Sequence, residues 1–146
     1  MRIDADTHIF PKEVLAKHKD VFTLRHDDSG KEWVEKASGG FVPFSPLKYD
    51  IKIRLDSMRD AGFEKEVLLG EPLVPLPFEP LETSIRVTRT YNDEVAKLGD
   101  KYDEFIPIAE VPHQDGREAL AELERAVEEL GMKGVRLFGS WCGKNL

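Results

Sequence analysis

Residues 3–11 read Ile-Asp-Ala-Asp-Thr-His-Ile-Phe-Pro, and this stretch decides how the rest of the chain is interpreted. Residues 2–9 are predicted to form a first strand, which Pro11 closes. Because side chains alternate along a strand, Asp4, Asp6 and His8 are expected on one face. Burying three unpaired ionisable groups is costly, so this strand needs a reason other than core packing for its polarity.

A carboxylate and an imidazole two residues apart at a strand end can bind one divalent ion side by side. Asp6 and His8 supply such a pair, and their oxygen and nitrogen donors suit zinc, manganese or iron. The two residues alone leave another interpretation open, in which His8 is hydrogen-bonded by a loop and binds no metal.

Regular elements resume at Tyr49 and alternate between helix and strand. The apolar helical stripes are Ile51, Leu55 and Met58; Val87, Tyr91, Val95, Leu98 and Tyr102; and Leu120, Leu123, Val127 and Leu130. Buried strands are expected at 66–69, 105–109 and 134–138. Thr83 is predicted to cap the second of these helices, and Asp115 with Glu118 resembles a capping box before the third. Gly62 and Gly131 suit helix ends.

Strands that alternate with helices predict parallel pairing and right-handed crossovers. An open doubly wound sheet and a closed barrel both fit. The polar first strand favours the barrel, where active sites lie at the carboxyl ends of the strands. No glycine-rich phosphate loop follows the first strand, which disfavours a dinucleotide-binding fold. A flavodoxin-like module would require a strand order that reverses around the first strand.

The predicted fold class is therefore α/β, a partial (β/α)8 barrel of four units with parallel strands in the order 1-2-3-4. A closed barrel takes about 250 residues, and this chain has 146. We interpret residues 1–146 as a single domain that is the first half of such a barrel. Residues 12–48 are predicted to be a long, irregular, polar insertion that serves as a lid or binding loop or is disordered.

The same segments resemble the amidohydrolase-related family of aminocarboxymuconate semialdehyde decarboxylase-like enzymes. In that family the first barrel strand reads Ile-Asp-x-His-x-His-x-x-Pro, so Asp6 stands at the first histidine position and His8 at the second. The likeness continues through 55–63, through Tyr91-Asn92-Asp93-Glu94-Val95, through 105–112 and through 122–135. It covers almost the whole chain outside residues 12–48.

This resemblance implies a metal-dependent enzyme that hydrolyses or non-oxidatively decarboxylates a small carboxylated substrate. It implies that Asp6 and His8 bind the metal, with zinc expected first and manganese or iron as alternatives. A further histidine from strand five and an aspartate from strand eight complete the family's site. Neither is present here, so no catalytic residue is assigned, and the chain is expected to be a fragment or truncated form that is inactive alone. The alternative is a non-enzymatic half-barrel that assembles through its open sheet edges.

Three further residues are candidates for substrate binding near the ends of later strands. His113 follows strand three, and its alternative is an exposed loop histidine. Arg136 can bind a carboxylate through two hydrogen bonds, although a structural ion pair is the commoner role. Trp141 can line a pocket at the mouth of strand four, or simply pack.

Composition limits the partners. The net charge is −7, which argues against nucleic acid, and no apolar run reaches the roughly 18 residues of a membrane span. Cys142 is the one cysteine, which suits a reducing cytoplasm. The expected partners are a small-molecule substrate and either a second copy of the chain or the missing half of the barrel.

Overall fold

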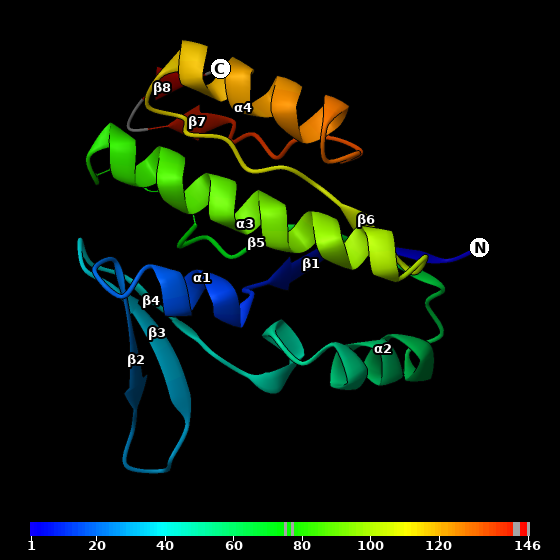
Figure 1. Cartoon of the computed structure of the whole chain (residues 1–146). Coiled ribbons are helices and arrows are strands. Elements are labelled where there is room, and N and C mark those ends of the chain that lie inside the picture. The colour runs from blue at the N-terminus through cyan, green and yellow to red at the C-terminus, as the bar shows by residue number, and fades with distance from the viewer. Residues whose placement is uncertain (75, 77, 142–143, 146) are drawn as a thin grey trace.

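The computed structural model describes residues 1–74, 76, 78–141 and 144–145, without the side chains of residues 141, 144 and 145 (Figure 1). Its elements in chain order are β1 (Ile3–Ile9), α1 (Lys12–Lys17), β2 (Phe22–His26), β3 (Glu32–Lys36), β4 (Phe41–Pro43), the 3-10 helix η1 (Pro46–Lys48), α2 (Ile51–Asp60), β5 (Lys65–Gly70), α3 (Leu81–Lys101), β6 (Phe105–Pro107), α4 (Gly116–Glu128), β7 (Ser140–Trp141) and β8 (Lys144–Asn145). Within the described residues, every helix is too short or too polar to cross a membrane.

A three-stranded parallel sheet holds the strands that the sequence pattern predicts as first, second and third. Their order is β1-β5-β6, with Ile9 opposite Gly70 and Glu66 opposite Phe105. The strand order follows the chain order and does not reverse around β1. This arrangement agrees with the barrel interpretation and not with the flavodoxin-like one.

The predicted fourth strand at 134–138 is wrong as a full sheet member. It contributes a single parallel bridge, between Ala109 and Val135, so the described sheet is not a run of four strands. The neighbouring strand β6 is only three residues long. It ends at Pro107, which has no N–H to extend a ladder.

The prediction of an irregular segment over residues 12–48 is also wrong. This segment contains α1, an antiparallel sheet of order β2-β3-β4, and η1. The turn between β2 and β3 is built by Asp27, whose carboxylate accepts hydrogen bonds from the backbone N–H groups of Ser29 (2.9 Å) and Lys31 (3.0 Å). Gly30 supplies the positive φ of 81° that this turn needs.

Of the two predicted N-caps, Asp115 is confirmed and Thr83 is wrong, while Asp50 caps a helix for which no cap was predicted. Asp50 accepts a hydrogen bond from the N–H of Ile53 at the start of α2, and Asp115 accepts from Arg117 and Glu118 at the start of α4. Thr83 is not a cap, because α3 begins at Leu81 directly after Pro80. Proline needs no amide partner there, and its fixed φ already suits the entry to a helix.

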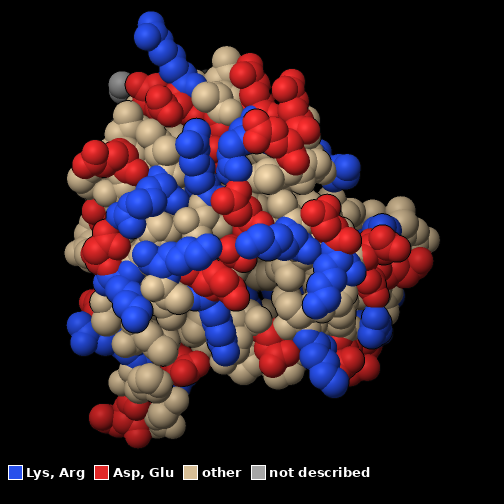
Figure 2. Space-filling model, in the orientation of Figure 1, with Lys and Arg blue, Asp and Glu red and all other residues tan. Residues whose placement is uncertain are grey.

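One buried cluster joins the parallel sheet to the inserted segment, with Tyr91, Phe10 and Phe22 among its largest members. The predicted stripe Leu120, Leu123, Val127 and Leu130 is only partly confirmed: Leu130 packs against the cluster, but Leu120 is 56% exposed and Val127 47%. The buried face of α4 instead presents Ala126 and Glu122. Figure 2 shows acidic and basic side chains interspersed over the face that α3 and α4 cover, as expected for solvated helix surfaces.

Candidate metal and substrate site

Asp6 and His8 lie side by side at the end of β1. The Oδ1 atom of Asp6 is 3.7 Å from Nδ1 of His8, and the two side chains are 78% and 32% exposed. Among the described residues, β1 is an edge strand of the parallel sheet and has a neighbouring strand, β5, on one side only. Both donors are therefore close together and open to a ligand.

A β-bulge changes the predicted arrangement of the three polar residues on this strand. Asp4 pairs with Glu66, but after the shift in register Thr7 pairs with Leu68 and His8 with Leu69. One residue of β1 is thus extra relative to β5, and the face that Asp4 shares with Glu66 is not the face of His8. The expectation that Asp4, Asp6 and His8 share one face is wrong for Asp4 and holds for the other two.

The end of β1 is fixed by two side chains from different elements. The Thr7 hydroxyl donates a hydrogen bond to the carbonyl of Val67 on β5 (2.7 Å). Arg54 on α2 donates from Nη1 to the carbonyls of His8 (3.0 Å) and Leu47 (2.7 Å). The Nε of the same arginine forms a 2.6 Å ion pair with Glu66. Arg54 therefore joins the backbone of the metal-ligand candidate to η1 and to β5.

The chemistry of the pair fits a divalent cation, but the number of donors is low. One carboxylate oxygen and one imidazole nitrogen are suitable ligands for zinc or manganese. Within the part of the chain that the structure describes, no group of three His, Cys, Asp or Glu side chains is placed to hold a metal. A catalytic zinc site usually has three protein ligands, so Asp6 and His8 can form only part of one.

His113 and Arg136 lie beyond the end of β6 and on the segment that bridges to it. The ring of His113 contacts that of Phe138 edge-on at 5.4 Å, and burial with the nearby Arg136 guanidinium lowers the pKa of His113. Arg136 stacks its guanidinium over Phe138 at 4.9 Å and forms an ion pair with Glu110 at 2.8 Å. The structure thus gives Arg136 a structural ion pair, which is one of the two roles that the sequence left open for it. The side chain of Trp141 lies outside the described residues.

Glu110 is the residue of this region that the sequence pattern did not single out. Its carboxylate is almost fully buried, and Oε1 accepts a hydrogen bond from the N–H of Gly70 at 3.0 Å. A Cβ on residue 70 would lie 2.6 Å from this oxygen, so any larger residue there would force the Glu110 side chain to shift. Among the described residues, Oε2 of Glu110 and Nε of Arg136 make no hydrogen bond, so the ion pair is close without being well aligned. A carboxylate directly after the apolar strand at 105–109 is the signal that could have revealed it.

The buried carboxylate of Glu110 is only partly compensated by Arg136, and this predicts that stability depends on pH. Burial raises the pKa of the Glu110 carboxyl from its ordinary 4.5 to about 7. Between these values the folded chain holds a proton that the unfolded chain has released, so this group's contribution to stability is lost as the pH rises through 7. We expect the free energy of unfolding of the wild type, relative to Glu110→Gln, to fall by about 3 kcal/mol from pH 4.5 to pH 8.

Urea denaturation of the wild type and of Glu110→Gln across this pH range measures that difference. The contributions of the other titrating groups cancel, because both proteins contain them. A difference that stays constant with pH would refute the raised pKa. A difference that grows with pH would show that the attraction of Arg136 outweighs burial and lowers the pKa of Glu110.

Asn92 on α3 positions the backbone of Glu110. Its amide oxygen accepts from the N–H of Glu110 (2.9 Å), while its Nδ2 donates to the carbonyl of Glu110 (2.9 Å) and to Oε1 of Glu122 (2.8 Å). Glu122 also pairs with Arg89 and Arg125, which explains its burial on α4. One side chain therefore ties the exit of β6 to both covering helices.

Comparison with known proteins places this chain in a family. The family model described as Amidohydrolase matches residues 3–146. A 2-amino-3-carboxymuconate-6-semialdehyde decarboxylase of Dictyostelium discoideum is 24% identical over 152 residues, which cover 100% of this chain and 42% of the relative.

Solved structures share the fold at low identity. The apo form of the Metarhizium anisopliae IDCase superposes with a TM-score of 0.76 at 16% identity, covering 100% of this chain and 44% of that one. A dihydroxybenzoic acid decarboxylase from a Polaromonas species, with bound manganese and an inhibitor, gives a TM-score of 0.65 at 22% identity, covering 92% and 37%. The chain spans about two fifths of the length of these proteins, and it belongs to the amidohydrolase family.

Proposed function

We propose that this chain supplies the first part of the metal site of an enzyme that decarboxylates or hydrolyses a small carboxylated organic substrate. The observation that carries the proposal is the Asp6–His8 pair, 3.7 Å apart at the end of an edge strand of a parallel sheet. Membership of the amidohydrolase family favours this function over a non-enzymatic half-barrel.

Asp6 and His8 would hold a divalent ion through a carboxylate oxygen and an imidazole nitrogen. When bound, such an ion lowers the pKa of a water molecule or polarises a substrate oxygen. The resemblance of the sequence led us to expect zinc first. The similar Polaromonas enzyme was solved with manganese, which makes manganese the first ion to test here.

Decarboxylation of an aryl or unsaturated carboxylate is the reaction we favour. Two of the similar proteins are decarboxylases by name, one for a carboxymuconate semialdehyde and one for dihydroxybenzoic acid. His113, Arg136 and Trp141 remain the proposed substrate contacts. Arg136 would share its guanidinium between Glu110 and the substrate carboxylate, since the ion pair to Glu110 occupies only part of it.

The remaining ligands would come from further strands, either on the same longer protein or on a second copy of the chain. The surfaces that such strands and their helices would cover are open in this structure. They include the free edge of β1 and the stripe of Leu120 and Val127 on α4. Large exposed apolar side chains on one face commonly mark an interaction site.

The test is release of CO2 from a dihydroxybenzoate by the full product of the gene, with and without added Mn²⁺. We expect activity that depends on the metal and falls on the order of 100-fold or more in Asp6→Asn and in His8→Asn, because each loses a ligand. Asp56→Asn is the matched control, since Asp56 is an exposed aspartate paired with Lys52 on α2. Activity that survives both site variants, or that needs no metal, would contradict the proposal.

A further inference from the structure

A second hollow, separate from the Asp6–His8 pair, opens between α1 and the β2-β3-β4 sheet. It encloses about 490 Å³, within the range of about 300–1,000 Å³ typical of small-molecule sites. The lining residues are Lys12, Leu15, Ala16, Lys19, Phe22, Thr23, Leu24, Glu32, Phe44 and Tyr49. Neither Asp6 nor His8 is among them, so this cavity is not part of the metal site.

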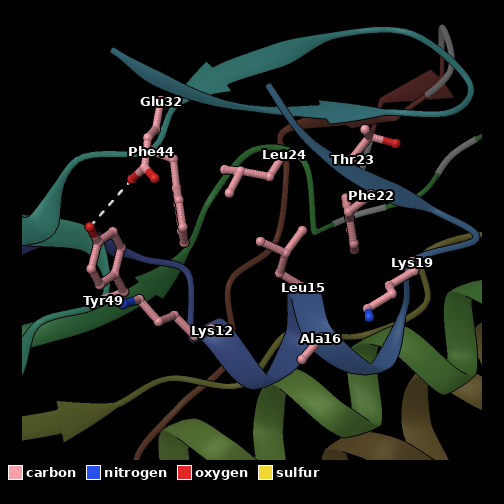
Figure 3. Close-up of a pocket in the computed structure, with 10 residues that line it drawn as sticks. All are labelled: Lys12, Leu15, Ala16, Lys19, Phe22, Thr23, Leu24, Glu32, Phe44 and Tyr49. Atoms are coloured by element: carbon pink, nitrogen blue, oxygen red, sulfur yellow. Dashed lines mark hydrogen bonds between the residues drawn. The ribbon is translucent and has the colours of Figure 1, made fainter. Parts of the chain in front are cut away.

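The middle of the hollow is apolar. Figure 3 shows Leu15 of α1 and Leu24 of β2 approaching from opposite sides, with the ring of Phe44 beyond one end and that of Phe22 beyond the other. Phe22 and Phe44 are buried and both pack edge-on against Phe10, which fixes the floor of the hollow in the main core. A rigid apolar body of matching size would gain from burial here.

The ends of the hollow are basic. Lys12 and Lys19 flank the apolar middle (Figure 3). Lys12 lies on α1 with Leu15 and Ala16, at the helical spacing i, i+3, i+4, and Lys19 lies in the turn that follows this helix. Within the described part of the chain, neither lysine forms an ion pair with a carboxylate. Lys12 places its Nζ 3.9 Å from the centre of the Tyr49 ring, which leaves its other N–H donors for a ligand.

The one carboxylate in the lining is already engaged. Glu32 accepts a 3.4 Å hydrogen bond from the Tyr49 hydroxyl and lies 3.3 Å from Nε2 of His26. Two lysines therefore face the hollow against a single carboxylate that other groups hold. This charge balance selects an anion and disfavours a cation.

We infer that this hollow binds a small organic anion, with an aromatic or aliphatic body between Leu15 and Leu24 and a carboxylate or sulfonate at Lys12 or Lys19. The site is distinct from the proposed metal centre, and its occupation does not depend on a metal. It goes beyond the proposed function, because it adds a second ligand site on the inserted segment.

Isothermal titration of the metal-free chain with 1-naphthoate and with octanoate tests this inference. We expect saturable binding of one equivalent of at least one anion, and at least tenfold weaker binding of 1-naphthylmethanol and octanol, which lack the charge. The double variant Lys12→Gln/Lys19→Gln should weaken anion binding at least tenfold. Lys52→Gln/Lys97→Gln is the matched control, since these exposed lysines lie outside the lining and should leave binding unchanged.

A third variant tests the cavity itself. Ala16→Trp places an indole in the hollow from an exposed helical position and should abolish binding of the anion. Far-UV circular dichroism and thermal melting show whether each variant remains folded, and the lysine variant keeps the test decisive if Ala16→Trp does not fold. Binding of neither anion, equal binding of the alcohols, or full binding by the lysine variant would overturn the inference. Preference for naphthoate over octanoate, or the reverse, would support the inference and show whether the hollow fits an aromatic or an aliphatic group.

Discussion

Replacing Arg54 by Met is expected to lower the free energy of unfolding by about 3–5 kcal/mol, the largest effect we predict for one side chain. Arg54 and Glu66 are both buried, with side chains 6% and 9% exposed, and they lie 2.6 Å apart. Removing the guanidinium leaves the Glu66 carboxylate buried without its partner. It also removes the donors to the carbonyls of His8 and Leu47, so the end of β1 loses its anchor.

Urea denaturation of Arg54→Met and of Arg59→Met measures this effect against a matched control. Arg59 lies on the same helix, but its pair with Glu104 is exposed, and such pairs contribute at most about 1 kcal/mol. The double variant Arg54→Met/Glu66→Leu should recover part of the loss, because no charge is then left buried. If Arg54→Met costs no more than Arg59→Met, the assigned role of Arg54 is wrong.

Replacing Asn92 by Ala should cost about 3 kcal/mol or more. The substitution removes three buried hydrogen bonds and leaves the N–H and carbonyl of Glu110 unpaired, and unpaired buried groups cost more than an average hydrogen bond contributes. The exit of β6 should also loosen, because no other described side chain bonds to the backbone of Glu110 in this way.

Thr88→Val is the control for Asn92→Ala. Thr88 lies one turn earlier on α3 and is equally buried, but among the described residues its hydroxyl makes no hydrogen bond. Removing that hydroxyl should change stability by less than about 1 kcal/mol, or raise it. Hydrogen exchange of the Glu110 amide offers a local measurement, in which protection should fall in Asn92→Ala and persist in Thr88→Val. Equal stability losses in the two variants would contradict the role of Asn92 in holding the backbone of Glu110.

Local sequence patterns predicted the elements whose periodicity is strong. The stripe Ile51, Leu55 and Met58 indicated α2, and the apolar run at 66–69 indicated β5, because each buries one regular face. The inserted sheet was missed because its strands mix charged and apolar side chains. β2 buries only Phe22, and β3 buries Val34 together with the charged Lys36. These strands are held by the turn at Asp27 and by their hydrogen bonding to each other, and their side chains do not alternate regularly between apolar and polar. Thr83 failed as a cap because Pro80, three residues earlier, already starts the helix.

The closeness of Asp6 and His8 could be predicted because they are two residues apart on one strand. The contacts that surround the pair could not be predicted from the sequence. Arg54 reaches Glu66 and the backbone of His8 across three elements, and Glu110 meets Gly70 across 40 residues. Such contacts depend on the register of the sheet, which sequence spacing does not determine. The bulge in β1 is of the same kind, and it separates Asp4 from the face of His8.

NMR of the chain titrated with Mn²⁺ is the most direct test of whether Asp6 and His8 together bind a divalent metal. Manganese broadens nearby resonances, and the chain has four histidines, so His18, His26 and His113 serve as internal controls in the same spectrum. We predict that the His8 ring resonances broaden first in the wild type and that Asp6→Asn requires at least about tenfold more metal for the same effect, a loss of about 1.4 kcal/mol. Broadening that begins at another histidine, or that is unchanged by Asp6→Asn, would contradict the account.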